Sequence, residues 1–410
     1  MHSHLLRAVA MTAALLPAFA PAAPLTLGQA LDLAVQRSES TRSARAGGLS
    51  AAESARAAGQ LPDPTLQAGI DNLPVTGAGA FRTTSDSMTM KRIGISQEWL
   101  SSQKRTARQA AAEAISARND AQVQAAMADT RLQTALAYVD AFHAKEALKL
   151  TLLMEHHAHE EFEASKARVA SATGNSQEVL ALMSARGMAE DESDEVRQQQ
   201  GEAVVALRRW VGIPIDELEP PVVPSPSTEA EFVAHLPSLV ALRRDVDVAK
   251  QAAAVTASER TPNWTWQVSY GQRTGYSDMV SVGVSIPLQV APAQRQDRET
   301  AAKLALVDRA EADLAEATRA ASAEYEALVG DVQRLQQRIA RYRTSVVVPA
   351  RQRIAAATAG YESSQVSLTT LFEARHAEVD AERKLLALQR DLAKAQVQLA
   401  FKPLSNGGDE

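Results

Sequence analysis

The sequence predicts a mixed α and β membrane protein, in which very long α-helices carry four short β-strands at one end. Residues 263–289 alternate between apolar and polar side chains over about ten residues per strand, which is typical of tilted strands in a transmembrane barrel. Long helical patterns rich in alanine and charged residues flank this strand pair on both sides. The same order of elements occurs twice along the 410 residues, which indicates an internal duplication.

Composition excludes several classes of protein. The formal net charge of −6 provides no basic footprint, so we do not expect nucleic acid as a partner. Aromatic residues make up 4% of the chain, too few for a large globular core but suited to extended helices with narrow seams. The chain has no cysteine, so neither disulfides nor a lipidated N-terminal cysteine are expected.

Residues 1–22 have the pattern of a secretory signal peptide. A modest polar start precedes an apolar run over residues 8–20, and Ala20-Pro21-Ala22 offers a cleavage site of small residues. The apolar run is too short to span a membrane as a helix. We therefore expect export of a mature chain without a transmembrane helix.

The first repeat covers residues 23–210. A helix starts at a capping box formed by Thr26 and Gln29 and runs to about Gly59, where Pro62 and Pro64 interrupt it. Strands follow over residues 66–71 and 88–99, separated by an exposed loop. Residues 101–173 contain no proline and no glycine, which predicts a helix of about 70 residues and about 105 Å. After a turn at residues 173–176, a helix of about half that length returns to residue 210.

A proline-rich connector over residues 211–235 joins the repeats, and the second repeat covers residues 236–400. Its first helix, its strand pair and a helix over residues 293–363 follow the order of the first repeat. Apolar residues recur in heptads along this last helix, and Pro349 should bend it. A turn at residues 365–368 precedes a shorter helix that ends near residue 400, and a flexible tail over residues 401–410 closes the chain.

The helix lengths predict how these elements stack. In each repeat the helix before the strands and the returning helix together match the long helix in length. The short helices should therefore stack end to end beside the long one, with the connector at mid-height. Strands then lie at one end of the molecule and two tight turns at the other.

Four strands cannot close a barrel, and an open sheet edge is not tolerated in lipid. We therefore expect two or more chains to share one barrel, whose polar strand faces line a water-filled lumen. Trp99, Trp264, Trp266 and Tyr270 are candidate membrane-interface aromatics, although simple strand packing explains them equally well.

Several motifs resemble the TolC-type outer-membrane efflux proteins. They are LTLGQALDLA at residues 25–34, LPDPTL at residues 61–66, and the stretch from Pro349 through Tyr361 to LFEAR at residues 371–375. DNLP at residues 71–74 and the compact length are most similar to the cobalt–zinc–cadmium efflux branch. Ser364 departs from the glycine that commonly follows the tyrosine, and Glu373 departs from an aspartate.

The resemblance implies a homotrimer with a shared transmembrane β-barrel in outer-membrane lipid of a Gram-negative bacterium. A long α-helical coiled-coil barrel would extend from it into the periplasm. The implied partners are a periplasmic adaptor (membrane-fusion) protein and an inner-membrane RND-type pump. The implied function is that of a passive exit duct for divalent heavy-metal cations, with drug efflux or protein secretion as alternatives.

The two helical turns are the natural docking tips for such an adaptor because they lie farthest from the strands. Their residues are Thr173, Gly174, Asn175, Ser176, Gln365, Val366, Ser367 and Leu368. Ordinary helix-hairpin turns are the alternative interpretation. Glu178 and Glu373 near these tips are candidate gate-lining acids, although a solvated surface explains each of them as well.

One cluster has the spacing of metal ligands. His156 lies on one helical face with His159 or Glu160. A polar patch on a solvated helix is the commoner explanation, so we expect no specific metal site and no cofactor.

No enzyme motif occurs in the chain, since it has neither a zinc-protease histidine pair, nor G-x-S-x-G, nor a phosphate-binding glycine loop. We therefore expect no enzyme. The remaining alternative is a soluble periplasmic coiled-coil scaffold with a small sheet at one end.

Overall fold

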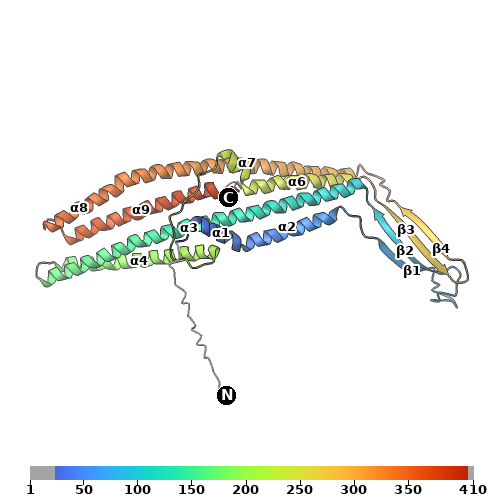
Figure 1. Ribbon diagram of the computed structural model, residues 1–410, viewed down its shortest axis with the longest axis horizontal. Coiled ribbons are helices and arrows are strands. Elements are labelled where there is room, and N and C mark those ends of the chain that lie inside the picture. The colour runs from blue at the N-terminus through green and yellow to red at the C-terminus, as the bar shows by residue number, and fades with distance from the viewer. Residues whose placement is uncertain (1–23, 405–410) are drawn as a thin grey trace, which may run out of the picture.

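The structure is a computed structural model that describes residues 24–404. The molecule is elongated, with a β-sheet at one end and two helical hairpins at the other (Figure 1). The predicted signal peptide over residues 1–22 lies outside the described residues. No helix among residues 24–404 is both long and apolar enough to cross a membrane.

The first repeat has the predicted order of elements. These are α1 (Leu27–Arg37), α2 (Glu39–Ala58), β1 (Thr65–Asp71), β2 (Met90–Trp99), α3 (Ser102–Ala170) and α4 (Ser176–Val211). The capping box of Thr26 and Gln29 is present. The prediction of a single helix up to Gly59 is wrong, because the chain leaves helical geometry at Ser38 (φ −65°, ψ 111°). The Ser38 hydroxyl accepts a hydrogen bond from the Thr41 N–H at 3.2 Å and so starts a second helix.

The second repeat has the same order of helices and strands as the first. It consists of α5 (Glu229–His235), α6 (Pro237–Ser258), β3 (Trp264–Arg273), β4 (Met279–Ser285), α7 (Gln296–Tyr342), a π-helical segment η1 (Arg343–Val347), α8 (Val348–Glu362) and α9 (Leu368–Phe401). Helix α5 lies inside residues 211–235, the stretch predicted as a proline-rich connector. Extended backbone at Leu236 separates α5 from α6, just as Ser38 separates α1 from α2.

The bend expected at Pro349 takes the form of a π-helical turn. Proline has no N–H to donate, and its ring clashes with the carbonyl group four residues earlier. The helix widens just before it, so that the Val348 N–H reaches the carbonyl oxygen of Arg343, five residues back. This turn joins α7 to α8 without breaking the helical path.

The helices form a wall that is one layer thick. Near the tips α4, α3, α9 and α8 lie in that order, and near the sheet the order is α2, α3, α6 and α7. Figure 1 shows α2 and α4 along one edge of this wall and α7 and α8 along the other. The short helices thus stack beside the long ones, as the helix lengths predict.

The largest core lies at mid-height, where the N-terminal segment and the connector meet α3. Leu25 and Leu218 form a short parallel β-bridge, and the Glu219 N–H donates to the carbonyl oxygen of Leu25 at 3.1 Å. The fully buried Tyr138 places its hydroxyl 2.6 Å from the Leu25 carbonyl oxygen and 2.8 Å from that of Glu219. Burial raises the pKa of Tyr138 to about 12, so this hydroxyl remains a donor.

The C-terminal end of the described chain packs against the second repeat. Phe401 is the last residue of α9, and the Leu404 N–H donates to the carbonyl oxygen of His235 at 2.8 Å. Residues 401–404 of the predicted tail are therefore part of the packed structure.

Candidate functional site

The four strands form one antiparallel sheet in the order β1-β2-β3-β4. The two hairpins pair with each other through β2 and β3, and Trp99 lies directly opposite Trp264. One edge of β1 and one edge of β4 have no strand partner among residues 24–404. An open edge of this kind is a template for pairing with another chain.

The register separates the side chains into two faces. One face is apolar and exposed, and it carries Leu66, Ile70, Ile93, Ile95, Trp99, Trp264, Val268, Tyr270, Val280, Val282 and Val284. Val282 is 74% exposed and Leu66 is 69% exposed. These exposed fractions are higher than a sheet of a soluble protein normally has for apolar side chains. This face can contact lipid.

The opposite face is polar, and it combines small residues with larger polar and charged ones. It includes Gln67, Ser96, Gln267, Ser269 and Ser281, together with several glycines. Gly94 is buried here, and a Cβ atom at this position would lie only 2.8 Å from the carbonyl oxygen of Val268. Glycine therefore permits the close approach of β2 and β3 on the polar face.

All four predicted interface aromatics lie on the apolar face. Trp99 and Trp264 form a tilted pair with ring centroids 5.9 Å apart at the end of the sheet next to the helices. Trp266 lies opposite Gln97 and Val284. Tyr270 lies six residues beyond Trp264, about 20 Å along the strand. Their position at a membrane interface stays a prediction.

The two predicted tips end in the same backbone motif. At the end of α3 the N–H groups of Ala172 and Thr173 bond back to the carbonyl oxygens of Val169 and Arg168 at 3.0 and 2.9 Å. At the end of α8 the N–H groups of Ser364 and Gln365 bond back to Tyr361 and Gly360 at 2.9 and 2.7 Å. Both patterns are Schellman motifs.

Each motif places a residue with a side chain in the left-handed region. Ala172 has φ 60° and Ser364 has φ 59°. Asn175 and Ser367 then cap α4 and α9. At Ser364, where the sequence departs from the family's glycine, the backbone therefore has a conformation that suits glycine better than serine.

We predict that Ser364→Gly raises the free energy of unfolding by about 0.5–1 kcal/mol, because it relieves the left-handed strain and this gain exceeds the entropy cost of glycine. Ser363→Gly is the matched control, since Ser363 has φ −85° and gains nothing from glycine. Thermal unfolding of the two purified variants measures the difference. A Ser364→Gly variant less stable than the wild type would contradict the interpretation.

Glu178 joins the two tips. Its Oε1 accepts a hydrogen bond from the Leu368 N–H at 3.0 Å, and its Oε2 lies 3.7 Å from the Arg168 guanidinium. The side chain is 12% exposed. Sequence reasoning missed this contact because the partners are 190 residues apart in the chain. Glu373 is exposed on the first turns of α9, and a gate-lining role for either acid stays a prediction.

A buried ion pair joins the same hairpins further from the turns. Arg375 donates to Glu161 Oε1 at 2.8 Å, while the other carboxylate oxygen of Glu161 has no hydrogen-bond partner among the described residues. The Glu161 side chain is 4% exposed. Burial raises the pKa of Glu161 to about 7, even though Arg375 opposes the rise.

This pKa predicts how stability depends on pH. Unfolded Glu161 ionises near pH 4.5, whereas the folded chain holds the proton until about pH 7. The stabilisation from this group is complete below the unfolded pKa and lost as the pH rises through the folded pKa. We predict that Glu161→Gln raises the unfolding free energy by about 1–3 kcal/mol at pH 8 and has little effect at pH 4.5. Thermal unfolding at both pH values checks this, with Glu326→Gln as the control, because Glu326 is exposed on α7, far from Glu161.

The histidine cluster does not form a ligand set. His156 Nε2 lies 3.3 Å and His157 Nδ1 3.5 Å from the Glu160 carboxylate. His159 is exposed on the same helix. No group of three or more histidine or acidic side chains within residues 24–404 has the arrangement of a metal site.

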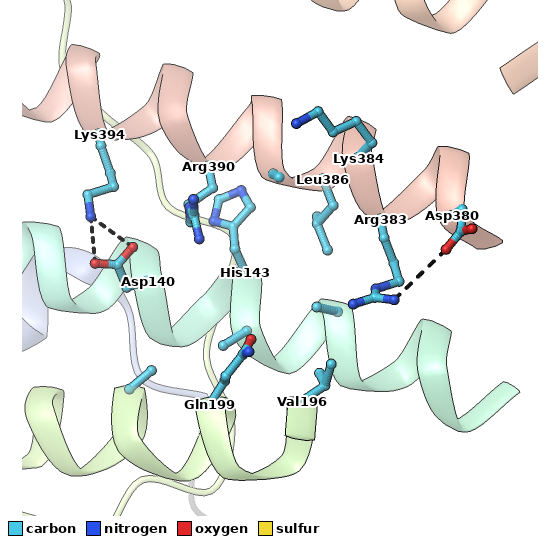
Figure 2. A pocket seen from close by; sticks show the side chains of 14 residues that line it. Asp140, His143, Val196, Gln199, Asp380, Arg383, Lys384, Leu386, Arg390 and Lys394 are labelled. Atoms are coloured by element: carbon cyan, nitrogen blue, oxygen red, sulfur yellow. Dashed lines mark hydrogen bonds and ion pairs between the residues drawn. The ribbon is translucent and has the colours of Figure 1, made fainter. Parts of the chain in front are cut away.

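A pocket of about 670 Å³ lies between α3, α4 and α9 (Figure 2). Lys394 pairs with Asp140 at 2.7 Å, and Arg383 pairs with Glu192. His143 lies between them, and burial lowers its pKa, so its imidazole is neutral at pH 7. The charges of this pocket are largely paired, so they link α9 to α3 and α4 rather than forming a ligand site.

No protein-family model matches the sequence, and no curated protein does either. Solved structures do match over almost the whole chain. The outer-membrane channel OprN is 15% identical, with a TM-score of 0.76 over 92% of this chain and 91% of its own. The chain has the fold of outer-membrane channels.

Two further solved structures have the same fold. The outer membrane protein VceC from Vibrio cholerae is 19% identical, with a TM-score of 0.75 over 92% of this chain and 96% of its own. CusC, a protein that forms a transmembrane channel, is 12% identical, with a TM-score of 0.76 over 92% of both chains. The resemblance to TolC-type proteins is confirmed at the level of the fold.

Proposed function

We propose that this chain is one subunit of an outer-membrane channel that serves as the passive exit duct of a tripartite efflux system. The observation that carries the proposal is the sheet, which exposes an apolar face and keeps a polar face on the other side. Both of its edges are unpaired in the described part of the chain. Lipid accepts such a sheet only when neighbouring copies complete it into a closed barrel. The fold shared with outer-membrane channels supports the same conclusion.

The proposed assembly is a homotrimer in the outer membrane of a Gram-negative bacterium. Its helical wall would continue the lumen into the periplasm, and a periplasmic adaptor and an inner-membrane RND-type pump would deliver the cargo. The tips at residues 173–176 and 365–368 are the proposed docking points, because they lie at the end of the wall opposite the sheet. Glu178 and Glu373 remain the proposed acids near a gate at that end.

The proposed cargo is a divalent heavy-metal cation, on the strength of the resemblance to the cobalt–zinc–cadmium branch. Deletion of the gene followed by growth on cobalt, zinc, cadmium and copper salts, beside organic toxicants, tests it. We expect lower metal tolerance. Unchanged metal tolerance with new sensitivity to organic toxicants would contradict the cargo and favour a drug-efflux channel.

A soluble coiled-coil scaffold is the competing function, and fractionation separates it from the channel. The channel sediments with the outer membrane and needs detergent for release. The scaffold would stay in the aqueous fraction. The exposed apolar face, to which all four strands contribute, favours the channel.

A further inference from the structure

We propose that the free edge of α4 docks against the free edge of α7 in a second copy of this chain, through a seam of opposite charges. This inference rests on the proposed function, which requires several copies, and it names the residues that align them. We call Asp191, Glu195 and Glu202 the acidic edge, and Arg338 and Arg341 the arginine edge.

The acidic edge lies on the side of α4 that has no helix against it. Helix α4 packs on α3 through Leu182, Ala185, Ala189, Ser193 and Val196. Asp191, Glu195 and Glu202 lie on the opposite face and are exposed. Within residues 24–404 none of the three has a cationic partner, whereas their neighbours Glu190, Glu192 and Asp194 are paired with arginines of the same chain.

The arginine edge has the opposite composition. Residues 332–353 contain six arginines and no acidic residue, while residues 190–202 contain six acidic residues and one arginine. Ile339 is buried toward α9, and Arg341 lies about 160° around the helix from it. Arg338 and Arg341 are exposed and form no ion pair in the described part of the chain, unlike Arg334, which pairs with Asp331. They border a groove with Asp391 of α9, but Asp391 pairs with Arg390 instead.

The two edges lie at matching heights above the tips. Along α4, Glu195 and Glu202 lie about 29 and 39 Å from Ser176. Along α8 and α7, Arg341 and Arg338 lie about 32 and 36 Å from Glu362. The contact between Glu178 and Leu368 holds the two tips level. Opposite charges therefore meet when copies stand side by side at equal height.

The sheet independently indicates the same arrangement. β1 continues the α2–α4 edge of the wall, and β4 continues the α7–α8 edge (Figure 1). The head-to-tail contact that brings α4 onto α7 of the next copy thus also brings β1 beside β4 of that copy. Heterologous contacts of this kind close into a ring when the rotation per copy permits it.

Disulfide trapping tests the seam directly, because the chain contains no cysteine. We expect Glu195→Cys with Arg341→Cys, oxidised in native outer membranes, to yield covalent oligomers on a non-reducing denaturing gel. Each single-cysteine variant should stay monomeric there. Glu195→Cys with Arg309→Cys is the matched control, since Arg309 is an exposed residue of α7 far toward the sheet. No cross-link in the Glu195/Arg341 variant would overturn the seam.

Charge reversal tests its electrostatic basis. We expect Glu195→Lys with Glu202→Lys, and separately Arg338→Glu with Arg341→Glu, each to reduce the oligomeric fraction in detergent at least tenfold at low salt. Combining all four changes restores complementarity and should return that fraction to within about twofold of the wild type. Full oligomers in both single-edge variants would overturn the seam and leave the channel intact, whereas a wild-type chain in the aqueous fraction would refute the channel itself.

Discussion

Replacing Tyr138 with alanine is expected to destabilise the mid-height core by about 3–5 kcal/mol, the typical loss for a buried aromatic side chain. Tyr138 is fully buried among Leu27, Leu207 and Val397, so its removal leaves a cavity where three segments meet. We expect limited proteolysis to cut the N-terminal segment and the connector first, because both bond to the Tyr138 hydroxyl.

The Tyr138→Phe variant measures the contribution of the hydroxyl group alone, because it keeps the aromatic ring. The Leu25 carbonyl oxygen still accepts from the Glu219 N–H, but the Glu219 carbonyl oxygen loses its donor. The expected cost is about 1–2 kcal/mol, measured by urea or thermal unfolding. Tyr342→Phe is the matched control, because Tyr342 is half-buried. A Tyr138→Phe variant as stable as this control would contradict the assigned role of the hydroxyl.

Replacing Lys104 with methionine is expected to cost about 2–3 kcal/mol at the junction of helices and sheet, because a buried cation and two of its hydrogen bonds are lost. The side chain of Lys104 is 2% exposed, and its Nζ lies 2.7 Å from Glu259 Oε2 and 2.7 Å from Asn263 Oδ1. Without the ammonium group, Glu259 Oε2 and the Asn263 amide oxygen lose this donor, while Arg108 still donates to Glu259 Oε1 at 3.1 Å. Thermal unfolding at pH 7 measures the loss.

Two companion variants make this result interpretable. Adding Glu259→Gln to Lys104→Met removes the carboxylate that has lost one of its two cations, and it should recover most of the loss. Arg108→Met should cost no more than about 1 kcal/mol, because its ion pair with Glu259 is 40% exposed on the arginine side. Equal effects of the two cation replacements would show that burial of Lys104 does not matter.

The Lys104 cluster also predicts a pH effect. Burial acts to raise the pKa of Glu259, but hydrogen bonds from Lys104 and Arg108 outweigh it and hold the pKa below its usual value. A lowered pKa stabilises the fold above the unfolded pKa, and this stabilisation is lost as the pH falls through the folded pKa. The acid end of the wild-type stability curve should therefore fall more steeply than that of Lys104→Met/Glu259→Gln.

The elements set by local chemistry could be predicted from the sequence. The helix over residues 102–170 follows from an uninterrupted run of helix formers without proline or glycine. The strand pair over residues 264–285 follows from strict alternation, and the apolar face predicted there is the exposed one in the structure. β4 ends at Ser285, sooner than its alternation suggests, because Pro287 cannot donate to a sheet.

Features set by distant contacts could not be predicted. The break at Ser38 needs the hydroxyl to cap a second helix, and the same hydroxyl also bonds Thr130 of α3 at 3.0 Å. The link from Glu178 to Leu368 and the pair of Glu161 with Arg375 join residues about 200 positions apart. The π-turn required knowing where a helix can widen without losing its path. Periodicity carries no information on any of these.

The central claim is that this sheet becomes a lipid-embedded barrel only when several copies share it. Native mass spectrometry of the protein extracted from outer membranes in detergent tests the claim most directly. We expect a homotrimer that retains bound lipid or detergent around the strands and resists dissociation until heated. A monomer that enters the aqueous fraction without detergent and carries no lipid would contradict the account.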